Sequence, residues 1–191
     1  MSNILFFDVE TSGDSHQNFM DRSDGYNYQI VSIGMIAVDP STWKPLAEQY
    51  TEIKWNGTSK WDKGAQRVHG LTPAYLEDNG VDEEDAFGLI CHFLTQWFDV
   101  SKPIIIGGVN VSTFDRHFIL SLFDKYESQL KLSGRSIDVA AIGTVLFGTT
   151  NSDELFEMFG VTRGVHNALE DAQAALTVAR KTNRLVAKLQ Q

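Results

Sequence analysis

The hydrophobic pattern of the chain begins with runs that are typical of buried strands. Residues 4–9 are apolar with almost no alternation, which indicates a central strand covered on both faces. Two more β-rich runs follow at 30–38 and 46–55, and the turn sequence DPS at 39–41 lies between them. The first part of the chain therefore predicts three antiparallel strands in succession.

The second part of the chain changes to helical spacing. Apolar residues recur at intervals of three and four between 87 and 98, and acidic residues at 82–85 precede them, where the helix dipole favours negative charge. Alternating helices and strands after an antiparallel start predict an α/β domain with a mixed five-stranded sheet flanked by helices. Short strands are predicted at 103–106 and 135–138, and further helices at about 114–126, 139–147, 152–159 and 168–189.

Length and composition predict one globular domain over residues 1–191. The chain is 42% hydrophobic and 21% charged, and its single cysteine, Cys91, excludes an internal disulfide. We expect a cytoplasmic protein without a membrane partner, because no apolar run approaches the ~20 residues that span a bilayer. The net charge of -9 argues against a broad basic surface for duplex DNA. Residues 12–29 form a long polar connection, a kind of loop that is often functional or disordered.

Acidic residues occupy three separated places that the surrounding pattern would fill with apolar side chains. Asp8 and Glu10 are two residues apart on the first strand and therefore point to the same side. Asp115 and Asp171 lie on the apolar stripes of two predicted helices. A carboxylate in such a setting costs several kcal/mol unless it is paired or binds a cation. No Lys or Arg lies beside Asp8, Glu10 or Asp171 in sequence, so the pattern predicts a metal site.

Asp115 also has a structural interpretation. Ser112 stands three residues before it, so that the pair is close to a capping box in which Ser112 would be the N-cap. Both roles can hold together.

His166 stands just before the last predicted helix. Asn167 and Glu170 form a capping-box start, which leaves His166 on the preceding loop, beside the fixed carboxylate of Asp171. A histidine there suits a general base, because imidazole changes charge near neutral pH. The alternative is a hydrophilic loop residue.

Three segments together resemble the motifs of the DnaQ-like (DEDDh) 3′–5′ exonucleases. They are residues 7–13 (FDVETSG), 114–115 (FD) and 166–172 (HNALEDA), and residues 67–73 (RVHGLTP) are similar to the segment that this family has between its first two motifs. The likeness covers roughly residues 4–180 and implies an RNase H-like fold. The ordered set with the histidine five residues before the last aspartate is what makes the likeness specific.

The resemblance also implies a chemistry for these residues. Two Mg²⁺ or Mn²⁺ ions would be held by Asp8, Glu10, Asp115 and Asp171, with His166 as general base, and ions ~3.5–4 Å apart stabilise both the attacking water and the departing 3′ oxygen. Contacts to the substrate are implied for Glu10, Thr11, Ser12, Gly13 and His69.

One position departs from the family pattern. An asparagine commonly stands four residues before the second-motif aspartate, but here Val111 is at that place and Asn110 is five residues before Asp115.

Residues 54–69 form a locally basic stretch in this acidic chain. Such a mixture of cations and aromatic rings suits single strands, whose bases stack on aromatic faces at ~1–3 kcal/mol each. The alternative is a solvated loop with two tryptophans in the core. The stretch contains Lys54, Lys60, Lys63, Arg67, Trp55 and Trp61 against one acid, Asp62.

The sequence therefore predicts a metal-dependent 3′–5′ exonuclease that acts on single-stranded nucleic acid, with DNA favoured, and releases nucleoside 5′-monophosphates. The expected partners are the 3′ ends of single-stranded DNA or RNA and a polymerase or replication protein. The alternatives are a 3′–5′ exoribonuclease or oligoribonuclease, a catalytically silent nucleic-acid-binding module, and a structural protein that uses Mg²⁺ only for folding.

Overall fold

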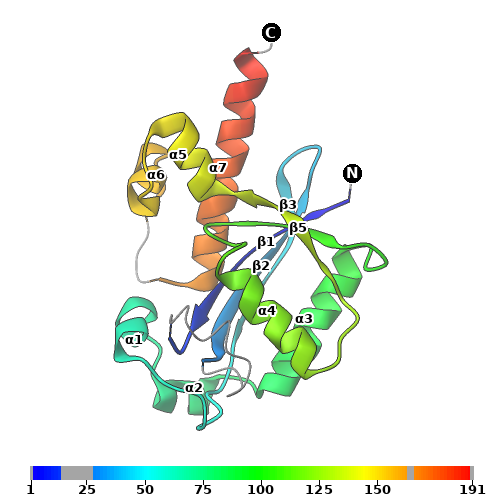
Figure 1. The fold of residues 1–191 in the computed structure, drawn as a ribbon, viewed down its shortest axis with the longest axis vertical. Coiled ribbons are helices and arrows are strands. Elements are labelled where there is room, and N and C mark those ends of the chain that lie inside the picture. The colour runs from blue at the N-terminus through cyan, green and yellow to red at the C-terminus, as the bar shows by residue number, and fades with distance from the viewer. Residues whose placement is uncertain (1, 14–27, 163–165, 190–191) are drawn as a thin grey trace.

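A five-stranded mixed sheet lies at the centre of the computed structural model, which describes residues 2–13, 28–162 and 166–189 (Figure 1). β1 pairs antiparallel with β2 and parallel with β4, while β2 pairs antiparallel with β3 and β4 parallel with β5. The predicted mixed sheet with three leading antiparallel strands is confirmed. Across the sheet the strands are β3 (Lys44–Glu52), β2 (Ile30–Asp39), β1 (Ile4–Thr11), β4 (Ile104–Gly108) and β5 (Leu132–Asp138).

Helices cover both faces of the sheet. In Figure 1, α3 and α4 lie on one face, and α7 crosses the other face with α5 and α6 beside it. None of the helices in the described part of the chain has the length and apolar character needed to cross a membrane. The helices are α1 (Lys63–His69), α2 (Pro73–Asn79), α3 (Glu83–Trp97), α4 (Asp115–Lys125), α5 (Val139–Phe147), α6 (Ser152–Met158) and α7 (Ala168–Leu189).

The first strand contributes to two separate cores. Leu5, Phe7 and Val9 pack with α3 and α4, whereas Ile4 and Phe6 pack with α6 and α7. Successive side chains of a strand point to opposite faces, so a strand covered on both sides needs apolar residues at every position. This explains why the run shows no alternation.

Two helix starts were predicted from capping residues, with different outcomes. Asn167 caps α7 as expected, because its Oδ1 accepts the backbone N–H groups of Leu169 at 3.0 Å and Glu170 at 3.3 Å. The predicted N-cap at Ser112 is wrong. Helix α4 begins at Asp115 without a side-chain cap, and the Ser112 hydroxyl donates to Ser136 instead.

Helices α1 and α2 were not predicted. Both are seven residues long, too short to show helical periodicity, yet each has a local start signal. Asp62 caps α1 with its carboxylate, and Thr72 followed by Pro73 begins α2. Of the long connection at 12–29, residues 14–27 lie outside the described residues.

Candidate active site

The predicted catalytic and metal-binding residues meet in one cleft at the end of the central strand. This cleft has a volume of about 460 Å³, and none of its described lining residues is Lys or Arg. Strand β1, the loop before α4, and the start of α7 each supply part of it. The lining consists of Asp8, Val9, Glu10, Val109, Asn110, Thr113, Phe114, Asp115, His166 and Asp171.

Gly34 explains how α7 reaches the cleft. It lies on β2 directly opposite Asp8, and a Cβ atom at this position would stand 2.3 Å from the backbone of Leu169. Only glycine allows the first turn of α7 to pack this closely on the sheet. The close approach places Asp171 beside the carboxylates of β1.

Asp115 is the most buried acid of the site. Only 2% of it is exposed, and its Oδ1 accepts the backbone N–H of Val9 at 2.9 Å, which ties the start of α4 to β1. Burial raises the pKa of the Asp115 carboxyl to about 7; the charges of Glu10 and Asp138 add to the rise, and the hydrogen bond from Val9 opposes it. A carboxylate held this way is costly until a cation compensates its charge.

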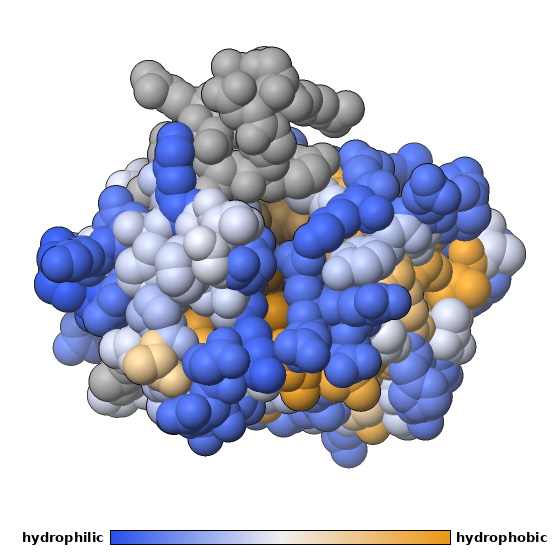
Figure 2. Space-filling model, turned by 90° about the horizontal axis from the view of Figure 1, so that it is seen from below, coloured by the Kyte–Doolittle hydropathy of each residue, from blue (hydrophilic) through white to orange (hydrophobic). Residues whose placement is uncertain are grey.

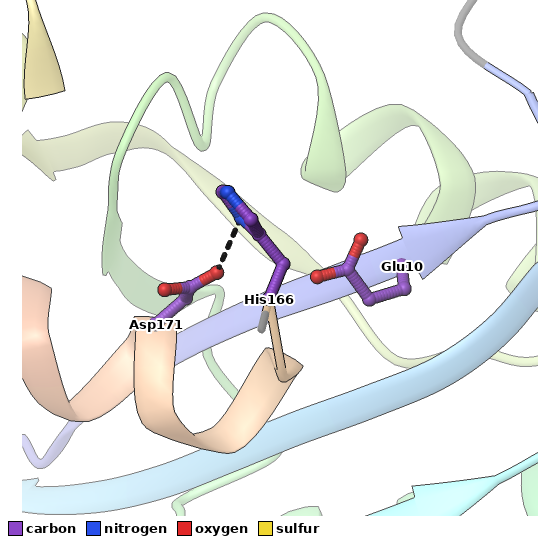
Figure 3. A group of neighbouring side chains, drawn as sticks. All are labelled: Glu10, His166 and Asp171. Carbon is purple, nitrogen blue, oxygen red and sulfur yellow. Dashed lines mark hydrogen bonds and ion pairs between the residues drawn. The ribbon is translucent and has the colours of Figure 1, made fainter. Parts of the chain in front are cut away.

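Glu10 on β1 converges with His166 and Asp171 at the start of α7, as Figure 3 shows. One nitrogen or oxygen atom from each lies within 4.8 Å of the other two, a spacing compatible with a shared cation. His166 Nδ1 lies 3.1 Å from Asp171 Oδ2. Asp171 has a buried side chain, as its place on the core-facing stripe predicted, whereas the His166 side chain is 38% exposed. The pair combines a fixed acid with a solvent-accessible imidazole.

Asn110 lines the cleft although it is one residue away from the place in the family pattern. Its backbone has a left-handed conformation (φ 51°), and its N–H donates to Asp138 Oδ1 at 3.0 Å. Asp138 also accepts the N–H of Ala140 and so caps α5. Val111, at the family position, is fully buried in the core. The turn thus brings Asn110 to the cleft and Val111 to the interior.

The turn after β1 uses its side chains internally. The Thr11 hydroxyl donates to the Gly13 carbonyl at 2.8 Å, and the Ser12 hydroxyl accepts the N–H of Gln29 at 3.0 Å. Both residues are buried. These side chains are therefore used within the fold, and Thr11, Ser12 and Gly13 are not among the residues that line the cleft. The predicted substrate contacts of Thr11, Ser12 and Gly13 remain a prediction.

His69 lies at the end of α1, and only 4% of it is exposed. Its Nδ1 accepts the N–H of Leu71 at 3.0 Å, and a ring that accepts at Nδ1 carries its proton at Nε2 when neutral. Burial lowers the pKa of His69, and the backbone of Thr11 opposes this shift. Nε2 makes no hydrogen bond within the described chain. The neutral ring therefore lies beside the backbone of Thr11, in the turn that follows β1. Its contact with substrate remains a prediction.

The two tryptophans of the basic stretch pack on each other. The Trp55 and Trp61 rings meet edge to face with centroids 5.6 Å apart, and their N–H groups donate to the Ser59 carbonyl and the Gln66 side chain. Neither ring belongs to the two hydrophobic clusters formed by the described residues. The stretch is therefore a loop over residues 54–62 with its own small aromatic centre, followed by α1.

A second cleft, of about 430 Å³, opens between this loop and α4. Asn56 and Lys60 line one side, and Phe118 and Lys125 line the other. Figure 2 views this end of the molecule and shows apolar side chains in the depth of a hollow between hydrophilic rims. Lys60 is exposed and, within the described ranges, takes part in no ion pair, whereas Lys125 is paired with Glu83.

Comparisons with known proteins give the fold. No protein-family model matches the sequence, and no curated protein matches it. Exonuclease I of E. coli in complex with a 5cy-dT13 oligonucleotide is 19% identical, with a TM-score of 0.73 over 96% of this chain and 41% of that chain. The zinc-ion-bound form of the E. coli exonuclease I complex with single-stranded DNA is 18% identical, with a TM-score of 0.77 over 99% and 43%. A moderately thermophilic exonuclease I from Methylocaldum szegediense is 17% identical, with a TM-score of 0.74 over 96% and 41%.

At these identities the likeness establishes architecture. The chain has the RNase H-like fold of exonuclease I, as the three motifs implied. It spans about two fifths of the length of these exonuclease I chains. Activity, substrate and partners are therefore matters for proposal.

Proposed function

We propose that the protein is a metal-dependent 3′–5′ exonuclease that digests single-stranded DNA and releases nucleoside 5′-monophosphates. The observation that carries this proposal is the gathering of four carboxylates and one histidine in a single cleft of an exonuclease I fold. The single-stranded DNA in several of the similar structures supports this choice of substrate. All five positions of the motif set are intact, which argues against a catalytically silent module.

The donor set of the cleft fits hard divalent cations. Carboxylate oxygens are the ligands that Mg²⁺ and Mn²⁺ prefer, and the described lining offers no Lys or Arg to balance their charge. Asp8, Glu10, Asp115 and Asp171 would hold two ions. Bound there, the ions would supply Lewis-acid stabilisation to both the attacking and the departing oxygen. The zinc-ion-bound form of the similar E. coli protein supports dependence on divalent metal.

His166 would take the proton from the attacking water. When its Nδ1 donates to Asp171 Oδ2, the ring is held in place and Nε2 keeps a lone pair for accepting that proton. A carboxylate has two oxygens, so Asp171 can orient the ring with one and contribute to cation binding with the other. Exposure of the His166 side chain gives water access to it.

Digestion of 5′-labelled single-stranded DNA and RNA, side by side with Mg²⁺ and with Mn²⁺, tests the proposal directly. We expect labelled products that shorten progressively from the 3′ end, with DNA digested faster than RNA, and no digestion in EDTA. A 3′-phosphate should block or slow the reaction where a 5′ block does not. Cleavage of a circular single strand would indicate an endonuclease instead, and faster digestion of short RNA would favour an oligoribonuclease.

A charge reversal at Lys60 should weaken the binding of long single strands of DNA. Lys60 is an exposed cation of the second cleft that takes part in no ion pair among the described residues, and loss of a phosphate contact raises KM and flattens its dependence on salt. We expect Lys60→Glu to raise KM on long single strands several-fold at low salt, with hydrolysis of a nitrophenyl ester of TMP unchanged. Lys63→Glu is the matched control, because Lys63 is exposed on α1 and is not among the residues that line either cleft.

Equal effects of both charge reversals would mean that general electrostatics, and not the second cleft, holds the strand. Loss of activity on the small ester would place Lys60 in support of the fold or of the metal site. A polymerase partner, a cytoplasmic location and a single domain over 1–191 remain predictions.

A further inference from the structure

Gln29 is a buried amide whose polar atoms are all used. Only 5% of it is exposed. Its Nε2 donates to the Lys54 carbonyl at 2.7 Å and the Ile30 carbonyl at 3.3 Å, while its Oε1 accepts the N–H of Asn56 at 2.8 Å. A side-chain amide has two N–H donors and one carbonyl acceptor, so this geometry uses the whole group. The sequence gives no signal for this role, because Gln29 stands as one polar residue directly before an apolar strand.

The backbone of Gln29 is bonded to the turn that follows β1. Its N–H donates to Ser12 Oγ at 3.0 Å, and its carbonyl accepts the Ser12 N–H at 2.9 Å. The Ser12 carbonyl in turn accepts the N–H of Asp62 at 2.7 Å. The hydrogen bonds therefore form a closed circuit from the turn to Gln29, on to the loop at 54–62, and back to the turn.

Packing reinforces this circuit. The Tyr28 ring lies against Gly13, where an added Cβ would stand 2.1 Å from the ring. The bonds between Ser12 and Gln29 thus join the described residues on either side of 14–27, which end at Gly13 and resume at Tyr28. If Gln29 lost its amide, Asn56 N–H and the Lys54 carbonyl would lose these partners, and only the bond from Asp62 N–H to the Ser12 carbonyl would still join the loop to the turn.

We propose that Gln29 is a positioning residue that holds the Thr11–Gly13 turn in place for binding the terminal nucleotide, by linking this turn to the loop at 54–62. The inference rests on the proposed function and on the substrate contacts that the family resemblance implies for that turn. It predicts an effect on nucleotide affinity and none on metal affinity, because the carboxylates of β1, α4 and α7 lie outside the circuit. Gln29 acts through the turn and does not itself touch the reacting atoms.

The test compares the affinity of the protein and its variants for a 5′-fluorescein oligothymidylate, measured by anisotropy with Ca²⁺ in place of the catalytic ion. Gln29→Met keeps the length of the side chain and removes its hydrogen bonds. We expect the Kd of this variant to rise about tenfold, the effect of losing roughly one to two hydrogen bonds. Its KM for single-stranded DNA and for the nitrophenyl ester of TMP should rise to the same extent, with little change in kcat. Mn²⁺ affinity should stay at the wild-type value, and amide exchange at Asn56 should become faster.

Two further variants keep the inference falsifiable. Asn151→Ala removes the N-cap of α6, far from the turn, and should lower the melting temperature without changing Kd. Gln29→Glu keeps an acceptor for Asn56 N–H but places a carboxylate oxygen against the Lys54 and Ile30 carbonyls, which repel it. It replaces Gln29→Met if that variant does not fold. An unchanged Kd with faster exchange at Asn56, or an equal rise of Kd in Asn151→Ala, would overturn the positioning role.

Failure of the proposed function gives a different result. Wild-type protein that hydrolyses no strand with either metal would refute the nuclease proposal. The anisotropy measurement would still decide the inference, since a tenfold difference in Kd between wild type and Gln29→Met does not depend on turnover.

Discussion

Asp115→Asn is expected to abolish hydrolysis while the protein still folds. The substitution keeps the shape of the side chain, and the Asn oxygen can still accept the Val9 N–H that joins α4 to β1. It removes one negative charge from a site where four carboxylates would share two cations. Turnover of single-stranded DNA with Mg²⁺ should fall to background, as measured by release of nucleoside monophosphate.

The same variant should be more stable than the wild type in EDTA at neutral pH. Burial raises the pKa of Asp115 from 3.8 to about 7, so the unfolded chain loses this proton before the folded protein does as the pH increases. The stability contributed by neutral Asp115 is therefore complete below about pH 4 and is lost as the pH rises to about 7. Asparagine stays neutral throughout and avoids a penalty on the order of a few kcal/mol.

Thermal melting in EDTA between pH 4 and pH 8 measures this difference. The melting temperatures of Asp115→Asn and wild type should be similar at the acid end and diverge toward pH 8, with the variant higher. Asp124→Asn is the control, because Asp124 is exposed on the same helix. A variant that keeps wild-type turnover would refute Asp115 as a ligand. Melting temperatures that change equally with pH in variant and wild type would show that the Asp115 carboxylate does not destabilise the protein without metal.

The sequence predicted the sheet because strands depend on local pattern, and the same pattern singled out acids that the structure brings into one cleft. Unbroken apolar runs identify strands covered on two faces, and an acid inside such a run stands out against its neighbours. Asp171 is an example, since its place on the apolar stripe of α7 predicted a buried side chain, as the structure has it. The ordered motifs then placed three distant segments together, which local pattern alone could not do.

The features that the sequence did not reveal depend on contacts between distant segments. The amide of Gln29 is bonded to Lys54 and Asn56, about 25 residues away, and nothing beside Gln29 in sequence indicates that. Position 34 is a second example. It must be glycine because the backbone of α7 lies against it, and no feature of β2 in the sequence indicates this. The wrong cap at Ser112 has the same origin. A distant strand residue, Ser136, binds its hydroxyl and leaves α4 to begin three residues later.

His166→Ala should lower the turnover rate by about 10²–10⁴-fold and leave metal binding nearly unchanged, because a general base makes this contribution to rate and is not a ligand. In the wild type, rate should fall as the pH decreases, since a protonated imidazole cannot accept the proton of the attacking water. The variant should lose this acid limb of the profile. His92→Ala is the matched control, because His92 is exposed on α3.

The measurements that separate a general base from a ligand are the pH profile of kcat and a titration with Mn²⁺. Since Glu10, His166 and Asp171 lie close enough to share a cation, a ligand role for the ring is the specific rival. A ligand would lower Mn²⁺ affinity when replaced, whereas a base would not. If His166→Ala keeps the acid limb, another group takes the proton, and if its Mn²⁺ affinity falls in step with its rate, the imidazole binds the metal.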